Sequence, residues 1–308
     1  MRFLPTRFYL ALGIGLLIAS CVSPQQSERH ALIIGIDGVR PDALLAASTP
    51  NFDSLVENGR VSWNAYAGGS EVAGDPSRQA TSSGPGWTSI LTGVWRNQHG
   101  VQDNSFEGYD QVHYPHLFQR IRDERPEASL VSIVNWVPIH EHLLAPFPGI
   151  ASALIEHNTD AGVATAAREQ LSAGAVDVLF LHFDEVDGAG HGFGYSTEVP
   201  EYIAAIEAAD LQLGRVLEAL RLREEDRGEK WMVIATTDHG GLHKSHGGQS
   251  KDEREIWVVA KGPGIEPGLD ANGPGHTIVT RTVLEHMGIQ VEDAWGLVDA
   301  NGFGMRRP

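Results

Sequence analysis

Cysteine is nearly absent from this sequence: Cys21 is the only one among 308 residues, so no disulfide can form within the chain. Basic residues are also few, with 23 lysines and arginines against 40 aspartates and glutamates, which gives a formal net charge of −17 at pH 7. This excess of acid argues against a protein that coats nucleic acid or binds anionic surfaces in general. It does not exclude a phosphorylated substrate, because bound cations can reverse the local field.

Familiar nucleotide-binding patterns are missing as well. The sequence contains no P-loop and no GxGxxG, and it shows no internal repeat and no coiled-coil heptads. Its composition, 42% hydrophobic and 20% charged, is ordinary for a globular protein. A chain of this length can hold two domains, although large α/β folds often form one. The function must therefore be inferred from other motifs.

The longest apolar run lies near the amino terminus, at Phe8–Ala19. It is too short and lies too early to predict a membrane span. It ends in Ile-Ala-Ser-Cys at residues 18–21, which resembles a bacterial lipobox. The resemblance implies that residues 1–20 are a lipoprotein signal peptide, cleaved before Cys21, whose thiol and new amino group are then acylated. The alternative is an ordinary secretory signal in which the cysteine is incidental.

The polar residues 21–29 are expected to form a tether ahead of the folded part at 30–308. Val22 follows the cysteine where an aspartate would favour retention at the inner membrane, and this favours the outer membrane. We therefore expect a protein of the bacterial cell envelope, lipid-anchored through Cys21 at the periplasmic face of the outer membrane. The membrane is accordingly an expected partner.

Three short apolar runs, rich in β-branched residues, predict buried parallel strands. These runs are Ala31–Ile36, Val176–Phe183 and Trp231–Thr237. Each is followed, at its carboxyl end or a few residues on, by a carboxylate: Asp37, Asp187 and Asp238. Open α/β sheets place their ligands at the carboxyl ends of parallel strands, so the sequence predicts an acidic site there.

The remaining elements complete an α/β pattern. Further strands are predicted at Val61–Tyr66, Leu130–Trp136 and Glu255–Ala260. Helices are predicted at Phe52–Asn58, Tyr114–Asp123, Thr159–Leu171, Glu201–Leu220 and His276–Met287. In the last helix, His276 and His286 are expected at the surface and not in a site.

Histidines accumulate beside two of the three aspartates. His191 is four residues after Asp187, so one turn of chain can aim both side chains at one ion. His239 directly follows the third aspartate, and His243 and His246 come within the next seven residues. Carboxylate and imidazole together suit a divalent metal such as zinc. The alternative is a solvated, glycine-rich loop that merely contains histidines.

A serine opens another segment with helical spacing. In Ser83–Gly93 the apolar residues recur at the period of a helix, and Ser83 lies just before Pro85, in the N-cap region. As a cap, Ser83 would satisfy an unpaired backbone amide and perform no chemistry. As a nucleophile, it would gain from the helix dipole and from amides that can hold a phosphate oxygen. The segment alone leaves both readings open.

Taken in order, these motifs resemble the alkaline phosphatase superfamily, in its nucleotide pyrophosphatase/phosphodiesterase branch. The features that carry the resemblance are Asp37-Gly38, Ser83 ten residues before the glycine of Thr92-Gly93, Asp187-x-x-x-His191, Asp238-His239-Gly240 and His246-Gly247. The resemblance implies an alkaline-phosphatase-like catalytic domain at 30–308, with a mostly parallel central sheet flanked by helices on both faces. Because His246 follows His239 so closely, it also implies a compact core without a large cap domain.

The same resemblance implies a site for two divalent metal ions, zinc or alternatively manganese. Carried over to this sequence, one ion would be held by Asp37, Ser83, Asp238 and His239, and the other by Asp187, His191 and His246. His246 is preferred to His243 because a glycine follows it. The implied activity is metal-dependent hydrolysis of phosphate esters, above all phosphodiesters, through a phosphoseryl intermediate at Ser83. A small-molecule phosphate ester is then the expected substrate; the alternatives are a phosphomonoesterase and a catalytically inactive, metal-stabilised binding lipoprotein.

The nucleophile segment departs from the family's usual pattern. The common nucleophile of this branch is the threonine of Thr-Phe-Pro-Asn, whereas residues 83–86 read Ser-Gly-Pro-Gly. Serine keeps the hydroxyl, but Thr81 and Ser82 are close enough to compete with it. A sulfatase that makes formylglycine from a cysteine is disfavoured, because the one cysteine is Cys21.

Gly86, at the end of that tetrapeptide, supplies no side-chain donor. A contact to a phosphoryl oxygen must then come from elsewhere, and Arg78, Asn104 and Asn135 are the candidates. A monoester dianion needs extra cationic contacts, and few basic residues lie near the serine in sequence. This favours a phosphodiester over a phosphomonoester.

Overall fold

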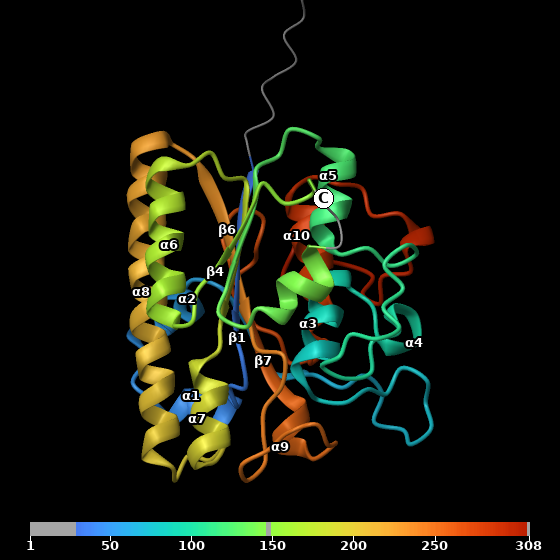
Figure 1. The fold of residues 1–308 in the computed structure, drawn as a ribbon. Helices are drawn as coiled ribbons and strands as arrows, with labels where there is room; N and C mark the ends of the chain where they lie inside the picture. Colours follow the sequence, from blue (N-terminus) through green and yellow to red (C-terminus); the bar gives the residue numbers. More distant parts are fainter. Residues whose placement is uncertain (1–28, 146–148, 307–308) are drawn as a thin grey trace, which may run out of the picture.

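The computed structural model describes residues 29–145 and 149–306, which form a sheet between two layers of helices (Figure 1). The strands are β1 Arg29–Ile36, β2 Arg60–Tyr66, β3 Leu130–Val134, β4 Ala153–Glu156, β5 Val178–Phe183, β6 Lys230–Thr236, β7 Glu255–Lys261 and β8 Gly268–Leu269. They form one 8-stranded sheet in the order β4-β3-β5-β1-β6-β7-β2-β8. The strands from β4 to β6 are parallel, and β7 runs antiparallel to β6 and to β2. The predicted α/β fold with a mostly parallel sheet is confirmed.

Helices cover both faces of this sheet, as predicted (Figure 1). One face carries α1 Pro41–Ala46, α2 Pro50–Glu57, α6 Asp160–Ala173, α7 Glu185–Phe193 and α8 Pro200–Arg227. The other face carries α3 Ser83–Thr92, α4 Arg96–His99, α5 Leu117–Glu124 and α10 Ile278–His286. Three short elements complete the described chain: a π-helical turn at Ile139–Leu144, α9 at Lys251–Arg254 and a 3₁₀ turn at Asp293–Trp295.

Strand β1 shows why the predicted strands are continuously apolar. Ala31 and Ile33 point into the core that α3 and α10 cover, whereas Leu32 and Ile34 point into the core that α6 and α8 cover. Successive side chains of a strand alternate between the two faces, so a strand with helices on both sides must be apolar at every position. This double burial is the signal that made β1, β5 and β6 predictable to within two residues.

Some predicted boundaries and placements are wrong. Helix α8 continues past the predicted end at Leu220 to Arg227, because the intervening residues are good helix formers and the left-handed Gly228 ends it. Helix α5 begins at Leu117 and not at Tyr114. Several elements were not predicted, namely α1, α7, β4 and β8.

His276 and His286 are not surface residues, contrary to the prediction. Their exposed fractions are 0% and 3%. The His276 ring lies 5.0 Å from the ring of Trp95, and His286 Nε2 lies 3.0 Å from the backbone oxygen of His30. Burial lowers the pKa of His276 to about 3 and that of His286 to about 4, so both are neutral core residues.

The predicted signal peptide at 1–20, with Cys21, and all but the last residue of the tether at 21–29 lie outside the described residues. Across 29–145 and 149–306, no helix combines the length and the apolarity needed to cross a bilayer.

Candidate metal centre

The three aspartates predicted from the strand ends come together because their strands are neighbours. β5, β1 and β6 lie side by side in the sheet. Asp37 directly follows β1, Asp238 comes just after β6, and Asp187 lies in the first turn of α7, which follows β5. Each strand delivers its carboxylate to the same edge of the sheet, where their side chains meet the histidines.

Asp37 is fixed by two donors and keeps one oxygen without a partner. Its Oδ2 accepts hydrogen bonds from Trp87 Nε1 at 2.9 Å and from His182 Nε2 at 3.2 Å. His182 must carry its proton on Nε2, because its Nδ1 accepts from the Trp136 amide at 3.4 Å. The other oxygen, Oδ1, is buried without a hydrogen-bond partner among the described residues. Two donors on one oxygen therefore aim the other oxygen into the site.

Asp238 presents a second unpartnered oxygen at the same place. Its Oδ2 is buried without a hydrogen-bond partner in the described part of the chain, while its Oδ1 faces the Gly38 amide at 3.4 Å. Burial, together with the neighbouring carboxylates, raises the pKa of both Asp37 and Asp238 well above their usual values. Two buried carboxylates side by side are unfavourable without a compensating charge.

His239 supplies a lone pair directed at these two oxygens. Its Nε2 lies 3.4 Å from Asp37 Oδ1 and 3.3 Å from Asp238 Oδ2. Its Nδ1 lies 2.7 Å from the Gly240 backbone oxygen, which can only accept, so the ring proton belongs on Nδ1. Two orphaned carboxylate oxygens and one imidazole lone pair are a donor set that fits a divalent cation.

The Ser83 hydroxyl joins this group and does not cap the helix. Ser83 is the first residue of α3, Ser82 takes the N-cap position without a capping bond from its side chain, and the Gly84 amide donates to Asn104 instead. Ser83 Oγ lies 3.4 Å from His239 Nε2, and the residue is 6% exposed. The capping alternative for Ser83 is therefore wrong. Thr81 is engaged elsewhere, since its hydroxyl donates to the Gly248 backbone oxygen at 2.9 Å.

Asp187, His191 and His246 form the second group. His191 Nε2 lies 3.3 Å from Asp187 Oδ2 and 3.0 Å from His246 Nε2, and His246 Nε2 lies 3.7 Å from Asp187 Oδ1. The Nδ1 atoms of both histidines face backbone oxygens, that of Lys244 for His191 at 3.0 Å and that of Thr81 for His246 at 2.9 Å. The two Nε2 atoms then face each other and a carboxylate. Such an arrangement fits a cation between them.

The charges of the second group are strongly coupled to one another. The pKa of His191 is raised to about 9, mainly by its hydrogen bond to Asp187, whereas burial lowers the pKa of His246 to about 4. Burial opposes ionisation of Asp187, but the bond to His191 and the charges of His239 and His246 outweigh it and lower the Asp187 pKa.

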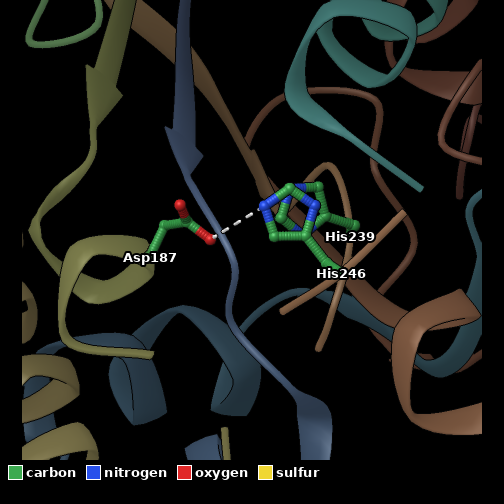
Figure 2. Close-up of side chains that lie close together, drawn as sticks. All are labelled: Asp187, His239 and His246. Atoms are coloured by element: carbon green, nitrogen blue, oxygen red, sulfur yellow. Dashed lines mark ion pairs between the residues drawn. The ribbon is translucent and has the colours of Figure 1, made fainter. Parts of the chain in front are cut away.

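His239 lies between the two groups. Figure 2 shows its ring beside that of His246, with Asp187 directed at the pair; the two ring centroids are 3.8 Å apart and the planes 21° from parallel. Asp187, His239 and His246 bring ligand atoms within reach of one ion, and so do Asp37, Asp238 and His239. The geometry thus lets His239 serve either ion, whereas the sequence assigned it to the first alone.

The structure separates the alternatives that the sequence left open. His243 is exposed and its backbone is left-handed with a φ of 56°, whereas His246 reaches the other ligands. Asn135 donates to Asp160 at 2.8 Å and is committed there. Asn104 accepts a hydrogen bond from the Gly84 amide at 2.8 Å, which holds its carboxamide next to the serine.

Gly86 is constrained by packing. A Cβ atom at this position would lie 2.9 Å from the Asp238 Cβ, closer than real Cβ atoms approach. Helix α3 therefore lies so close to Asp238 that the side chain usual at this position in the family does not fit.

Sequence reasoning missed the residues that hold the ligands. Trp87 was read only as part of an apolar stripe, and His182 only as part of a buried strand. Tyr195 was not noticed, yet its hydroxyl donates to Asp187 Oδ1 at 2.5 Å. The one available signal was His182, a lone histidine inside an otherwise apolar run.

Comparisons with known proteins agree with this picture. The sequence profile described as the metalloenzyme superfamily matches residues 37–278, which include every candidate ligand. A phosphopentomutase from Pectobacterium carotovorum is 26% identical over 179 residues, covering 58% of this chain and 40% of its own. A mouse bis(5'-adenosyl)-triphosphatase is 24% identical over 239 residues, covering 71% of this chain and 48% of its own. The chain thus spans about half or less of the length of these relatives.

Solved structures show the same fold. A 2-O GAG sulfatase superposes with a TM-score of 0.67 at 16% identity, covering 85% of this chain and 71% of its own. Murine ectonucleotide pyrophosphatase/phosphodiesterase 5, in complex with AMP, superposes with a TM-score of 0.64 at 14% identity, covering 89% and 97%. The similarity to both a sulfatase and a phosphodiesterase leaves the reaction to be argued from the site.

Proposed function

The chain belongs to the metalloenzyme superfamily, and on this premise we propose that it hydrolyses phosphate esters, phosphodiesters in particular, through a phosphoseryl intermediate at Ser83. The observation that carries the proposal is the convergence at His239 Nε2. Two buried, unpartnered carboxylate oxygens and one serine hydroxyl all lie within 3.3 to 3.4 Å of that nitrogen. This is a constellation for an activated nucleophile.

Two divalent ions, zinc or manganese, would supply the activation of the Ser83 hydroxyl and of the hydrolytic water, and would neutralise charge on the phosphoryl group. The proposed ligands are Asp37, Ser83, Asp238 and His239 for one ion and Asp187, His191 and His246 for the other. Trp87 and His182 keep Asp37 in place, so these ligands are oriented before a substrate arrives.

The protein itself orients the phosphoryl group. Ser83 is the first residue of α3, so the positive end of the helix dipole would face the bound phosphoryl group. Asn104 accepts from the Gly84 amide, which leaves its NH2 group to donate to a phosphoryl oxygen. These contacts bring the phosphorus in line with the serine hydroxyl.

The scarcity of cations supports a diester. Among the described residues, no lysine or arginine makes an ion pair with Asp37, Asp187 or Asp238. A monoester dianion demands more positive charge at the scissile phosphorus than a diester monoanion does. The phosphomonoesterase remains the second candidate within this reaction class.

The test compares three nitrophenyl substrates with the purified, metal-loaded protein. Bis(p-nitrophenyl) phosphate should turn over faster than p-nitrophenyl phosphate, and p-nitrophenyl sulfate should turn over slowest. A reversed order of the two phosphates establishes the phosphomonoesterase. No turnover of any of them at full metal content supports the inactive binding lipoprotein and contradicts the proposal.

We also propose that the protein is tethered through Cys21 to the periplasmic face of the outer membrane, on the strength of the sequence at 18–21. Cys21→Ser should release the protein from the membrane fraction or leave it unprocessed. Normal membrane retention of this variant contradicts the anchor.

A further inference from the structure

A pocket of about 300 Å³ lies beside the metal centre. Its wall contains Ala80, three residues before Ser83, and Gly247, directly after His246. Because consecutive Cα atoms are about 3.8 Å apart, the wall comes within roughly 12 Å of the Ser83 Cα. We call it the arginine pocket, after Arg78 and Arg96, which also line it.

Neither arginine is neutralised. In the described part of the chain, Arg78 and Arg96 have no carboxylate within ion-pair distance, and the Arg78 guanidinium donates only to the Glu71 backbone oxygen, at 2.7 Å. By contrast, Arg223 is paired with Glu229 at 2.6 Å.

One carboxylate also lines the pocket, but it is engaged within its own turn. Asp75 Oδ1 accepts from the Ser77 amide at 2.8 Å and from the Ser77 hydroxyl at 2.6 Å. Both bonds go to the same oxygen, so the carboxylate keeps its charge, but it lies beyond ion-pair distance of Arg78 and Arg96. The two guanidinium groups therefore stay available to an anion from outside.

Hydrogen bonds connect the residues that line the pocket to helix α3, which begins with Ser83. Gln79 is 2% exposed; its Oε1 accepts from the Arg96 amide at 3.0 Å and its Nε2 donates to the Pro85 backbone oxygen at 3.1 Å. Gln249, on the other wall, donates to the Gln79 backbone oxygen at 2.6 Å. The pocket is therefore formed before any ligand binds, and it holds a set position relative to Ser83.

We propose that the arginine pocket binds a second phosphate group of the substrate while the scissile phosphorus lies at Ser83. The proposal rests on the proposed function and narrows its substrate to phosphodiesters or phosphoanhydrides that carry a further phosphate. Guanidinium groups bind phosphate oxygens through paired, charge-assisted hydrogen bonds. The volume exceeds that of one phosphate, so part of the attached group also fits.

The experiment compares Arg78→Gln/Arg96→Gln with the wild type on two substrates. ATP carries further phosphates, and bis(p-nitrophenyl) phosphate does not. A hydrogen bond to a charged group contributes enough that kcat/KM for ATP should fall roughly tenfold or more, mainly through KM. Turnover of bis(p-nitrophenyl) phosphate should stay within about twofold, because Asn104 and not Arg78 is held next to Ser83, whereas the Arg78 guanidinium donates to the Glu71 backbone oxygen. The matched control is Arg221→Gln, which removes an exposed, ion-paired arginine on α8 and should change neither rate.

An equal fall for both substrates, or no fall for ATP, overturns the proposal. A second measurement separates its failure from failure of the proposed function. In calorimetric titration with inorganic phosphate, the double variant should bind one equivalent fewer than the wild type at unchanged metal content. If the wild type turns over no phosphate ester but still binds one phosphate more than the double variant, the phosphate-binding role of the pocket is supported and the proposed reaction is wrong. Identical phosphate binding by both proteins rejects the pocket.

Discussion

The two groups of proposed ligands in the candidate metal centre differ most in how deeply they are buried. The side chains of Asp37, Asp238 and His239 are at most 1% exposed. In the second group, the side chain of His191 is 46% exposed, while those of Asp187 and His246 are 13% and 10% exposed. One centre thus combines a fully enclosed half with a half open to solvent.

The difference extends to the residues that hold each group. Asp37 is held by Trp87 and His182, both buried in the sheet's core. Asp187 is held by the single hydroxyl of Tyr195, and its partners come from a short helix and a loop. A buried carboxylate pair gains more from a cation than an exposed one does. We therefore expect the first ion to bind tightly and the second to exchange.

The largest effect should come from Ser83→Ala, which removes the nucleophile from the enclosed half. Turnover should fall by roughly a thousandfold or more. Metal content should change little because Asp37, Asp238 and His239 remain as ligands, and the melting temperature should change little because Ser83 does not cap the helix. Steady-state kinetics, metal analysis and calorimetry check this.

Two further variants serve as controls for that result. Ser83→Thr should retain some activity, and Ser82→Ala should be close to wild type. If Ser83→Ala is active and Ser82→Ala is not, the neighbouring serine is the nucleophile. If both are active, the covalent mechanism is wrong.

Removing one proposed ligand from each group should show how the buried group differs from the more exposed group in stability. Asp238→Asn should lose one equivalent of metal, yet it should stabilise the metal-free protein at pH 7. The sign follows because burial raises the pKa of Asp238 above its value in the unfolded chain, so at any pH above that unfolded value of about 3.9 folding must either take up a proton or bury a charge. His246→Gln should lose the other equivalent without this gain. Chemical denaturation with and without a chelator distinguishes them; equal behaviour of the two variants contradicts the contrast.

A smaller effect is expected from Tyr195→Phe. The ring should stay in place, because it fills the space beside Gly190 and Gly241, where a Cβ atom would come within 2.2 and 2.3 Å of it. Only the hydroxyl that holds Asp187 is lost, and metal affinity of the exposed half should fall about 10- to 100-fold. Competition with a zinc chelator should show that one of the two bound ions is held more weakly than in the wild type. At saturating metal, kcat should return to the wild-type value. Trp87→Phe is the counterpart in the enclosed half and should weaken the other equivalent instead.

A last effect, on stability alone, concerns a histidine that is buried but belongs to neither half. The pKa of His286 is lowered to about 4 by burial, below the value of about 6.5 in the unfolded chain. The unfolded state then binds the proton more readily, so stability is lost as pH falls through 6.5 towards 4. His286→Gln should reduce the loss of unfolding free energy between pH 7.5 and 5 by about 2 kcal/mol. Urea unfolding at both values measures it, and an unchanged pH dependence would show that His286 is not the cause.

The carboxylates of the centre could be predicted because each follows a local signal. An apolar run that ends in an aspartate, as at Asp37, needs no knowledge of the rest of the chain. The histidines near Asp187 and Asp238 are likewise near them in sequence. That His239 also comes within reach of Asp187 and His246 could not be predicted, since it depends on how distant segments of the chain pack together.

The holding residues depend on contacts between distant segments. Trp87 bonds to Asp37 across 50 residues of sequence, and His182 across 145. Nothing beside either residue in the sequence marks that partnership. The same reason explains the misplaced His276 and His286, because the burial of a histidine near a helix depends on what packs against it.

Strand β1 also sets the reach of the proposed membrane-anchored protein. The described part of the chain begins with strand β1 at Arg29, and the candidate metal centre starts beyond Ile36, at the opposite end of the same strand. Eight strand residues advance about 26 Å, at about 3.3 Å each. Residues 21–28 can add at most about 28 Å when fully extended. With lipid attached at Cys21, the candidate site would lie at the end of β1 that faces away from the bilayer, up to roughly 50 Å from the membrane surface. This position favours dissolved substrates over lipids of the leaflet that holds the anchor.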